Sequence, residues 1–285
     1  MNPYLHLVSE YARFAQEGKN YPLGKFPPAA RPDIAENAPN VLFFAPHPDD
    51  ETIQGGLALR LLREAKWNVL NVAVTQGSKK ERQAERLIEL KRACDYLGFG
   101  LVQTGVNALE HVTNKTRDQN KPHWSQMVKI ISDILATQKP RAIFFPHELD
   151  WNSTHIGVHF LIMDALQSLP PEFQCYLIET EFWGQMASPN LMVEYSVADV
   201  ADLVTATSFH IGEVQRNPYH ILLPAWLQDN VRRGAELVGG QGEAAPDFIF
   251  GQLYRLRKWN GKTAENVYEG GKHLSTGENA ATLFM

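Results

Sequence analysis

Short, continuous apolar runs of strand length most constrain how this chain can fold. They lie at residues 41–45, 69–74, 142–145 and 176–178 and are rich in β-branched and aromatic side chains. Continuous apolar strands are typical of a sheet that is buried on both faces. The segments between them have helical patterns, which predict helices at residues 53–65, 87–97, 124–138, 156–168 and 197–214. This alternation predicts an α/β fold, with a Rossmann-like, mostly parallel sheet and helices on both faces.

The organisation along the chain predicts a single domain over residues 1–285. Five prolines between residues 20 and 40 indicate that residues 1–39 form an N-terminal arm that is extended on the surface. Residues 40–182 then form the α/β core, and residues 183–285 form a loop-rich C-terminal extension. Within that extension, residues 216–224 and 239–246 are rich in proline, glycine and asparagine, which predicts long loops that shape a pocket.

Composition excludes several classes of partner. The formal net charge of −5 provides no basic field for nucleic acid. No segment reaches the roughly 18 apolar residues that a membrane span needs, and the N-terminus has no signal-like apolar stretch. Cys94 and Cys175 are too few for a disulfide framework, which suits a reducing compartment. We therefore expect a soluble cytoplasmic protein without nucleic-acid or membrane partners. The sequence is compatible with a homo-oligomer.

The first apolar run leads directly into histidine and three carboxylates, in the segment Pro46-His47-Pro48-Asp49-Asp50-Glu51. Crowded carboxylates repel one another unless a cation holds them, and ligands bind outside the carboxyl ends of strands in open α/β sheets. His47 and Asp50 can ligate one ion, while Asp49 faces what the ion activates. Helix capping by the two aspartates is the competing interpretation, which the adjoining histidine and Gly55-Gly56 disfavour.

A second strand end repeats this arrangement. The run at residues 142–145 is followed by the segment 147–159, in which Asn152, Ser153 or Thr154 can cap a helix. His155 and His159 then share one helical face, and histidines at this spacing can bind one zinc ion together. Three ligands, His47, Asp50 and His155, would leave the open position that a catalytic site needs, whereas His159 as a fourth would approach a closed structural site.

Together, these segments resemble the PIG-L, or LmbE-like, family of zinc-dependent N-acetylglucosaminyl deacetylases. The family's Pro/Ala-His-Pro-Asp-Asp-Glu motif is complete at residues 46–51. The resemblance implies that His47, Asp50 and His155 bind the metal and that Asp49 is the general base. The family's second motif, His-x-Asp-His, is altered, because Asn152 stands where its first histidine is usual. His159 or His147 could supply the chemistry of that histidine, and we take His159 as the catalytic candidate.

A third match lies in Thr75-Gln76-Gly77, which resembles a Thr-x-Gly turn of the family, followed by a helix with Arg86. In family members the arginine of that helix contacts sugar hydroxyls, so the resemblance implies that Arg86 binds substrate. A surface charge paired with Glu85 or Glu89 is the competing interpretation. Trp151, Trp183, Trp226 and Tyr219 are candidates for stacking on a sugar, although ordinary packing also explains each of them.

The resemblance implies a metal-dependent hydrolase that removes the acetyl group from a small N-acetylated amino sugar of the N-acetylglucosamine type. Metal-bound water would attack, with Asp49 as general base. Zn²⁺ is the expected cofactor, although the ligand types also suit Fe(II), Mn(II), Co(II) or Ni(II). Two alternatives stay open: an amidase that acts on a larger sugar or thiol conjugate, and a catalytically impaired, metal-dependent sugar-binding protein. Nucleotide binding is disfavoured because no glycine-rich phosphate loop follows the first strand.

Overall fold

A computed structural model of the protein describes residues 2–285. Within these residues the strands form one nine-stranded sheet with the order β3-β2-β1-β4-β5-β7-β6-β9, and β8 pairs with β7. The strands are β1 (Asn40–Ala45), β2 (Asn68–Ala73), β3 (Gly100–Gln103), β4 (Ala142–Pro146), β5 (Cys175–Thr180), β6 (Leu191–Glu194), β7 (Gly251–Trp259), β8 (Ala264–Asn266) and β9 (Lys272–Leu274).

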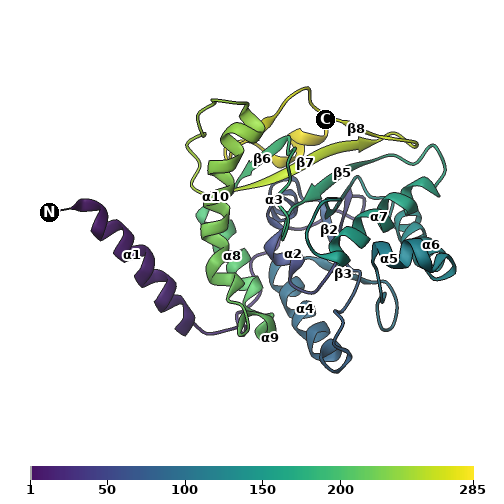
Figure 1. Ribbon diagram of the computed structural model, residues 1–285, viewed down its shortest axis with the longest axis horizontal. Helices are drawn as coiled ribbons and strands as arrows, with labels where there is room; N and C mark the ends of the chain where they lie inside the picture. Colours follow the sequence, from purple (N-terminus) through teal and green to yellow (C-terminus); the bar gives the residue numbers. More distant parts are fainter. Residues whose placement is uncertain (1) are drawn as a thin grey trace.

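The helices surround this sheet (Figure 1). They are α1 (Pro3–Glu17), α2 (Asp50–Ile53), α3 (Gly56–Ala65), α4 (Gln83–Leu97), α5 (Asn114–Gln119), α6 (Lys121–Gln138), α7 (Ser153–Gln167), α8 (Val197–Thr207), α9 (Ile211–Val214) and α10 (Tyr219–Gly239). Three short 3₁₀ segments are η1 (Gly18–Asn20), η2 (Lys80–Arg82) and η3 (Ala280–Phe284).

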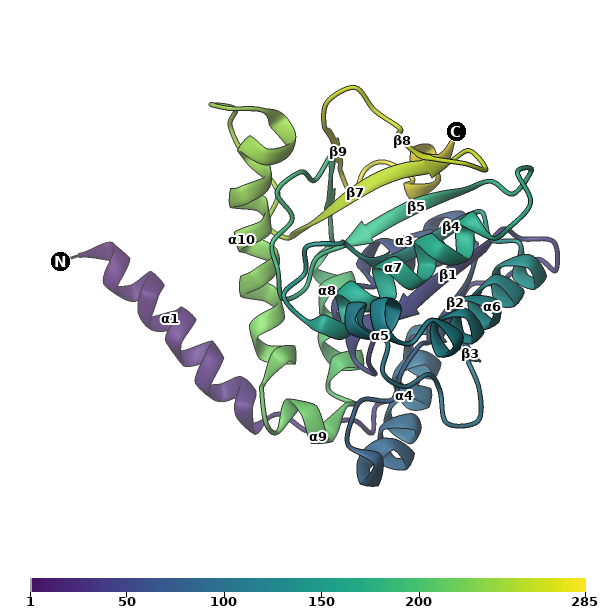
Figure 2. The ribbon, with the colours of Figure 1, turned by 45° about the vertical axis from the view of Figure 1, so that its right-hand side comes forward.

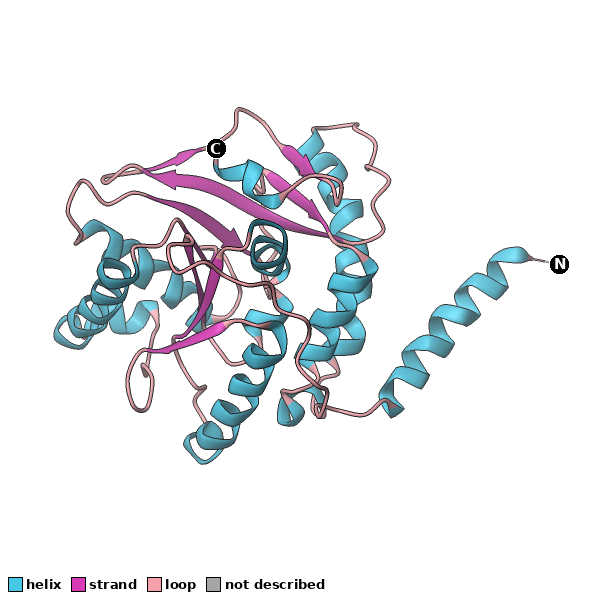
Figure 3. Ribbon diagram, turned by 180° about the vertical axis from the view of Figure 1, so that it is seen from behind, coloured by secondary structure: helices cyan, strands magenta, loops and turns pink. Residues whose placement is uncertain are grey.

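The sheet has a parallel part and an antiparallel part. Strand β1 pairs in parallel with β2 and β4, β2 with β3, and β4 with β5. Strand β7 then pairs antiparallel with both β5 and β6, and Figure 3 shows it as a long strand across the upper part of the molecule. The prediction of a mostly parallel sheet is therefore confirmed.

Side chains of β1 alternate between two apolar cores, one on each face of the sheet. Val41 and Phe43 point into the core that α3, α4 and α8 cover. Leu42 and Phe44 point into the core that α6 and α7 cover. Since successive strand residues face opposite sides, a fully apolar strand needs helices on both faces. The prediction of helices on both faces is confirmed.

Two of the predicted helices are interrupted. The segment predicted at residues 53–65 is divided into α2 and α3, with the break at residues 54–55. Gly55 sits so close to α2 that a Cβ atom there would lie 2.0 Å from the Glu51 carbonyl oxygen, so only glycine fits this break. The segment predicted at residues 197–214 is divided into α8 and α9, and residues 208–210 between them carry His210 towards the first strand end.

The C-terminal part is more regular than its composition indicates. Residues 240–250 lie outside regular structure, as predicted for residues 239–246. The predicted loop at residues 216–224 is wrong in its second half, because α10 begins at Tyr219 and contains Pro224. A proline in the second turn removes one backbone donor, and burial of Leu223 and Leu227 from the same helix compensates. The extension also contributes β6 to β9, whose pairing involves residues far apart in sequence.

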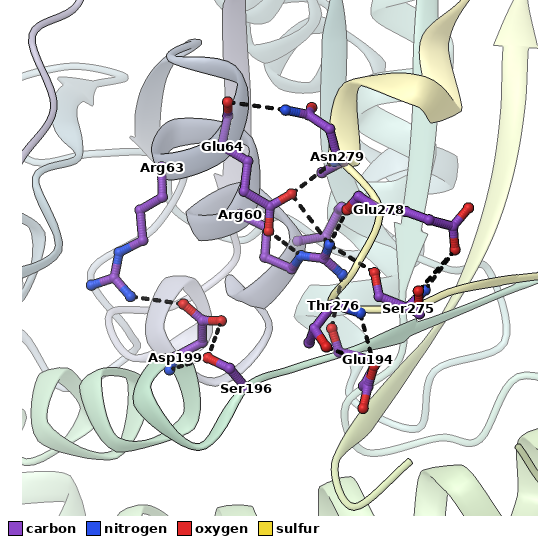
Figure 4. Close-up of polar contacts among 12 residues, drawn as sticks. Arg60, Arg63, Glu64, Glu194, Ser196, Asp199, Ser275, Thr276, Glu278 and Asn279 are labelled. Carbon is purple, nitrogen blue, oxygen red and sulfur yellow. Dashed lines mark hydrogen bonds and ion pairs between the residues drawn. The ribbon is translucent and has the colours of Figure 1, made fainter. Parts of the chain in front are cut away.

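A buried arginine ties the C-terminal end to the core (Figure 4). Arg60 of α3, only 1% exposed, donates from Nη1 to the Glu194 carbonyl at 2.9 Å. Its Nη2 donates to the carbonyls of Ser275 and Glu278 at 3.0 and 2.6 Å, and its Nε pairs with Glu64 at 2.6 Å. One guanidinium thus satisfies three backbone acceptors from two distant segments, which fixes the position of β6 and the last residues.

The N-terminal arm contains a helix that the sequence interpretation did not include. Helix α1 projects away from the body in both views of Figures 1 and 2, and its apolar side chains are exposed. Within the N-terminal arm, residues 21–39 contain neither helix nor strand, as the prolines predicted. Among residues 2–285, no helix combines the length and the apolar character that crossing a membrane requires.

Candidate metal centre

Both sequence motifs lie at the carboxyl ends of neighbouring parallel strands. Strand β1 is flanked by β2 on one side and by β4 on the other, so the chain changes direction across the sheet between β1 and β4. In open α/β sheets a crevice forms at such a switch point, outside the carboxyl ends of the strands. The turn at residues 46–50 follows β1, and the turn at residues 147–152 follows β4.

Three side chains from these turns converge. The ligand atoms of His47, Asp50 and His155 all lie within 4.8 Å of one another. His47 Nδ1 is 3.2 Å from His155 Nε2, and Asp50 Oδ2 is 3.4 Å from that same His155 atom. Asp50 Oδ1 is buried and has no hydrogen-bond partner among the described residues. Two imidazole nitrogens and a carboxylate with one unsatisfied oxygen, this close together, are a donor set suited to a divalent transition metal.

The charges within this group support one another. Burial would raise the pKa of Asp50, but the imidazoles of His155 and His47 outweigh burial and lower it. Burial would likewise lower the pKa of His155, but the carboxylates of Asp50 and Asp150 outweigh it and raise the pKa. Burial lowers the pKa of His47, which favours the neutral imidazole that metal binding requires. Among the described residues, no lysine or arginine forms an ion pair with Asp50.

Asp49 has an unusual backbone conformation beside this group. Its φ of +119° lies in a region that side chains other than glycine rarely adopt, so the turn stores strain at this residue. Its side chain lines a cavity together with His47. Burial, followed by the negative charge of Asp50, raises the pKa of Asp49 well above its ordinary value. A raised carboxyl pKa brings a group closer to the range in which it can accept a proton near neutral pH.

Glu51 and His210 hold the strained turn in place. Glu51 Oε2 accepts a hydrogen bond from the Asp49 backbone N–H at 3.0 Å, and His210 Nε2 donates to Glu51 Oε1 at 2.7 Å. Burial would lower the pKa of His210, but Glu51 outweighs burial and raises it. The sequence interpretation missed His210, because nothing at residue 210 in the sequence indicates contact with Glu51, 159 positions earlier.

Asp150 is a second contributor that sequence reasoning missed. Its Oδ2 atom lies 3.7 Å from His155 Nδ1 and accepts hydrogen bonds from the backbone N–H groups of Trp183 and Gly184. A carboxylate behind a metal-binding histidine orients the ring and raises its basicity. An aspartate five residues before a candidate ligand, after a buried strand, was the available signal in the sequence.

Asn152 and His147 have distinct positions in the second turn. Asn152 is the N-cap of α7: its Oδ1 accepts from the backbone N–H groups of Thr154 and His155. The same side chain lines the cavity beside His47. His147 is bonded through both ring nitrogens, donating from Nε2 to the Gly184 carbonyl and accepting at Nδ1 from the Leu149 N–H. His147 therefore has no free ring nitrogen for a substrate.

His159 does not join the first group. Its Nδ1 donates to the Pro146 carbonyl at 3.0 Å and lies 3.5 Å from Glu179 Oε1. Together with Glu148 and Glu179 it forms a second cluster of potential ligands. Burial lowers the pKa of His159. It lines neither of the two cavities beside His47, so its position gives the predicted catalytic role no support.

Arg86, for which substrate binding was predicted, lies beside the first turn. It donates from Nη2 to the Pro48 carbonyl at 2.9 Å and lines the cavity with His47 and Asp49. Gly77, at φ +82°, makes room for it, since a Cβ atom there would lie 2.2 Å from Arg86 Nη1. Thr75 Oγ1 donates to the Pro46 carbonyl, which connects this turn to the first one.

Two adjoining cavities open beside His47, which is the member of the convergent group that lines both. One measures about 290 Å³ and the other about 390 Å³. Their shared lining residues are His47, Gly77, Ser78 and Asn152. Both cavities have the size of a small-molecule site. Phe182, Trp183 and Tyr219 form an aromatic side of the first cavity, so residues after the α/β core contribute to it.

Several solved structures share this fold. An N,N'-diacetylchitobiose deacetylase from Pyrococcus horikoshii has 17% identity and a TM-score of 0.55, covering 79% of this chain and 85% of its own. The A40926 pseudoaglycone deacetylase Dbv21 has 13% identity and a TM-score of 0.56, covering 80% and 100%. A 4-carboxy-2-hydroxymuconate hydratase from Pseudomonas putida KT2440 has 14% identity and a TM-score of 0.56, covering 76% and 95%. At these identities the likeness concerns the fold.

A family model gives the more specific match. The model described as "PIG-L: GlcNAc-PI de-N-acetylase" matches residues 42–166, which include both strand-end motifs. None of the curated proteins searched matches the chain. The matched range covers β1 to β4 and most of α7, and it therefore contains His47, Asp50 and His155. Residues 42–166 of the chain therefore match the PIG-L (LmbE-like) family, which confirms the resemblance drawn from its motifs.

Proposed function

We propose that this protein is a zinc-dependent deacetylase that hydrolyses the acetamide group of an N-acetylglucosamine-type amino sugar. The observation that carries this proposal is the convergence of His47, Asp50 and His155 beside Asp49, at the edge of a cavity of small-molecule size. The match of residues 42–166 to the PIG-L family and the fold shared with two deacetylases support a metal-dependent deacetylase. The shared fold alone does not decide the reaction, because a hydratase has it too.

The residues of the centre fit a divalent metal. His47, Asp50 and His155 would hold it, with the unsatisfied Asp50 Oδ1 among the available donors. Two imidazoles and one carboxylate suit zinc and leave a coordination position open for catalysis. When bound there, the metal supplies Lewis acidity and lowers the pKa of water. Asp150 keeps the His155 ring oriented from behind.

Asp49 is the proposed general base. It lies one residue from Asp50 but takes no part in the convergent group, so its carboxylate is free to accept a proton from the attacking water. Its raised pKa, caused first by burial and next by Asp50, suits this role. The hydrogen bond from its own backbone N–H to Glu51, which His210 secures, maintains the strained turn that aims the carboxylate.

Asn152 is the proposed donor to the developing oxyanion of the acetyl group. Its Oδ1 is used in capping α7, which leaves the Nδ2 amide as the group available at the cavity. An amide donor near the reacting carbonyl stabilises the charge that appears in the transition state. Asn152 would thus take over part of the chemistry of the histidine that is usual at this position. Arg86 is the proposed substrate-binding residue on the other side of His47.

Acetate release from N-acetylglucosamine derivatives tests the proposal. The wild-type protein is measured after metal removal and after reconstitution with zinc. Asp49→Asn is the informative variant, because asparagine tolerates a positive φ and keeps the volume of the side chain. We expect this variant to retain one metal per chain while its rate falls at least roughly 10²-fold, the low end for loss of a general base.

Other outcomes would contradict parts of the proposal. Equal rates for Asp49→Asn and wild type would exclude Asp49 as the base. No acetate from any acetylated sugar, with one metal bound, would favour the impaired sugar-binding protein. Release of a larger acyl group from a conjugate, without acetate release, would favour the amidase that acts on larger substrates. A parallel assay of alkene hydration checks the reaction named for the hydratase with this fold.

A further inference from the structure

One side of the first cavity is strongly cationic. Lys79, Arg82, Arg86 and Arg216 line the cavity of about 290 Å³, whereas its acidic lining residues are Asp49 and Glu213. The whole chain has a net charge of −5, so this local excess of positive charge runs against the overall balance. The cations also come from separate parts of the chain, because Arg216 follows α9 and the other three lie between β2 and the middle of α4.

A single carboxylate serves three of these cations. Glu213 Oε1 is 3.0 Å from Arg82 Nη1 and 3.8 Å from Arg86 Nε, and its Oε2 accepts from Arg216 Nη2. Burial would raise the pKa of Glu213, but Arg216, Arg86 and Arg82 outweigh burial and lower it, so the carboxylate is ionised. Three guanidinium groups thus share one ion-paired carboxylate, and Asp49 is the other acidic residue that lines this cavity. Lys79 adds another positive charge to the cavity lining and forms no ion pair with the described residues.

The arrangement is built into the fold. Glu213 is only 5% exposed, and Arg86 is largely buried with an Nε that has no hydrogen-bond partner among the described residues. Two glycines make room for the guanidinium groups. A Cβ atom at Gly77 would lie 2.2 Å from Arg86 Nη1, and one at Gly212 would lie 2.2 Å from Arg82 Nη2. A solvated surface patch would need neither this burial nor this clearance.

Resting on the proposed function, we infer that the acetylated substrate carries an anionic group, a phosphate or a carboxylate, which Arg82, Arg216 and Lys79 bind. Guanidinium groups bind both kinds of oxyanion through paired N–H donors. The exposed Trp183 and the adjacent Tyr219, with ring centroids 6.0 Å apart, offer an apolar wall for the sugar ring between the anion and the metal centre. The anionic group therefore selects the substrate, while Asp49 and the metal ligands perform the reaction.

A panel of sugars that differ in charge tests this inference. The neutral member is N-acetylglucosamine, the phosphorylated members are its 1-phosphate and 6-phosphate, and the carboxylate member is N-acetylmuramic acid. Acetate release gives kcat/KM for each sugar, and calorimetry on Asp49→Asn gives binding without turnover. We expect at least one charged sugar to exceed the neutral one roughly 10-fold in both measurements, as for one charge-assisted contact. The difference between phosphate and carboxylate members identifies the anion.

Arg216→Gln is the decisive variant, and Arg232→Gln is its matched control. Both arginines are exposed, with 62% and 73% of the side chain accessible, and each pairs with a carboxylate three residues earlier. Only Arg216 lines the cavity. We expect Arg216→Gln to reduce the ratio of kcat/KM between charged and neutral sugars roughly 10-fold, and Arg232→Gln to leave this ratio unchanged. Higher salt should weaken the preference in the wild type and much less in Arg216→Gln.

The outcomes separate the two proposals. Acetate release from charged and neutral sugars at equal efficiency would overturn the inference and leave the deacetylase proposal intact. Failure to release acetate from any sugar, while charged sugars still bind more tightly through Arg216, would overturn the deacetylase proposal and support the anion site. Equal binding of charged and neutral sugars would overturn the inference whatever the acetate assay shows. A preference that persists in Arg216→Gln at full size would exclude this cluster as its source.

Discussion

Two clusters of histidine and carboxylate side chains lie near the carboxyl end of β4, and they differ in what balances their charge. The first contains His47, Asp50 and His155, and the second contains Glu148, His159 and Glu179. In the second, Arg255 pairs with both glutamates and Arg257 pairs with Glu179 at 2.8 Å. In the first, the ion-pair partners of Asp50 among residues 2–285 are the two histidines.

The comparison shows that two clusters with similar potential metal ligands can have different roles. Crowded carboxylates need a cation, but the cation can be an arginine of the chain as well as a metal. The second cluster is compensated by two guanidinium groups from β7, so it behaves as a buried ion network. The first keeps an unsatisfied carboxylate oxygen and two convergent ring nitrogens, which suits an external cation. Five substitutions, in four tests, probe this distinction.

The largest effect is expected from replacing one of the two α7 histidines, His155 or His159, at a time. His155→Ala should lose the bound metal and at least roughly 10³-fold in rate, because it removes a ligand and the metal chemistry with it. His159→Gln should retain one metal per chain. Metal content by mass spectrometry and acetate release check both variants. Loss of metal in His159→Gln would mean that the second cluster also takes part in metal binding.

Replacement of Arg255 should leave negative charge in the second cluster without a partner. Arg255→Gln would leave the buried Glu179 with one cationic partner instead of two and Glu148 with none. We expect the free energy of unfolding to fall by about 3 kcal/mol, as for a broken buried ion pair. Added zinc should restore part of it, because the released glutamates and His159 can then act as ligands. Urea unfolding with and without zinc measures this, and an unchanged stability would show that the arginine does not compensate the cluster.

A third test asks which cluster supplies the chemistry of the absent motif histidine. Asn152→Ser keeps an N-cap oxygen on α7 but removes the amide donor at the cavity. We expect a fall of roughly 10² in kcat with the helix and the metal content preserved, in line with loss of an oxyanion donor. His159→Gln is the comparison from the second cluster. A larger loss of kcat in His159→Gln than in Asn152→Ser would reverse the assignment.

The smallest effect concerns acid stability. Burial would raise the pKa of Glu148, but the hydrogen bond from Arg255 outweighs burial and lowers the pKa to about 2 from the model-compound value of 4.5. The resulting stabilisation is fully present above the unfolded pKa and is lost as the pH falls toward the folded pKa. After discounting for solvent, Glu148→Gln should remove about 1 kcal/mol of this pH-dependent stability. Urea unfolding at pH values from 4.5 down to about 2 checks it, and identical pH profiles in that range would contradict the pairing.

The sequence allowed most of the parallel core to be predicted, but little of its antiparallel part. Strands β1, β2, β4 and β5 are mostly apolar, and burial on both faces leaves that pattern in the sequence. Strand β7 contains Arg255, Arg257 and Lys258 among its apolar residues, so it lacks the pattern. It becomes a strand by pairing with β5, although residues 181–250 separate the two strands, and local periodicity cannot indicate such a contact.

For the candidate site, the sequence by itself determined the part that follows strand β1. His47, Asp49 and Asp50 follow one strand without interruption, so their proximity is a consequence of covalent connection. Tertiary structure decided which distant residues join them. It brought His155 to His47 while it directed His159 toward Glu179, although the two lie one helical turn apart. It also supplied His210 behind Glu51 and Arg255 beside Glu148, because packing, not spacing, determines which charges from remote segments meet.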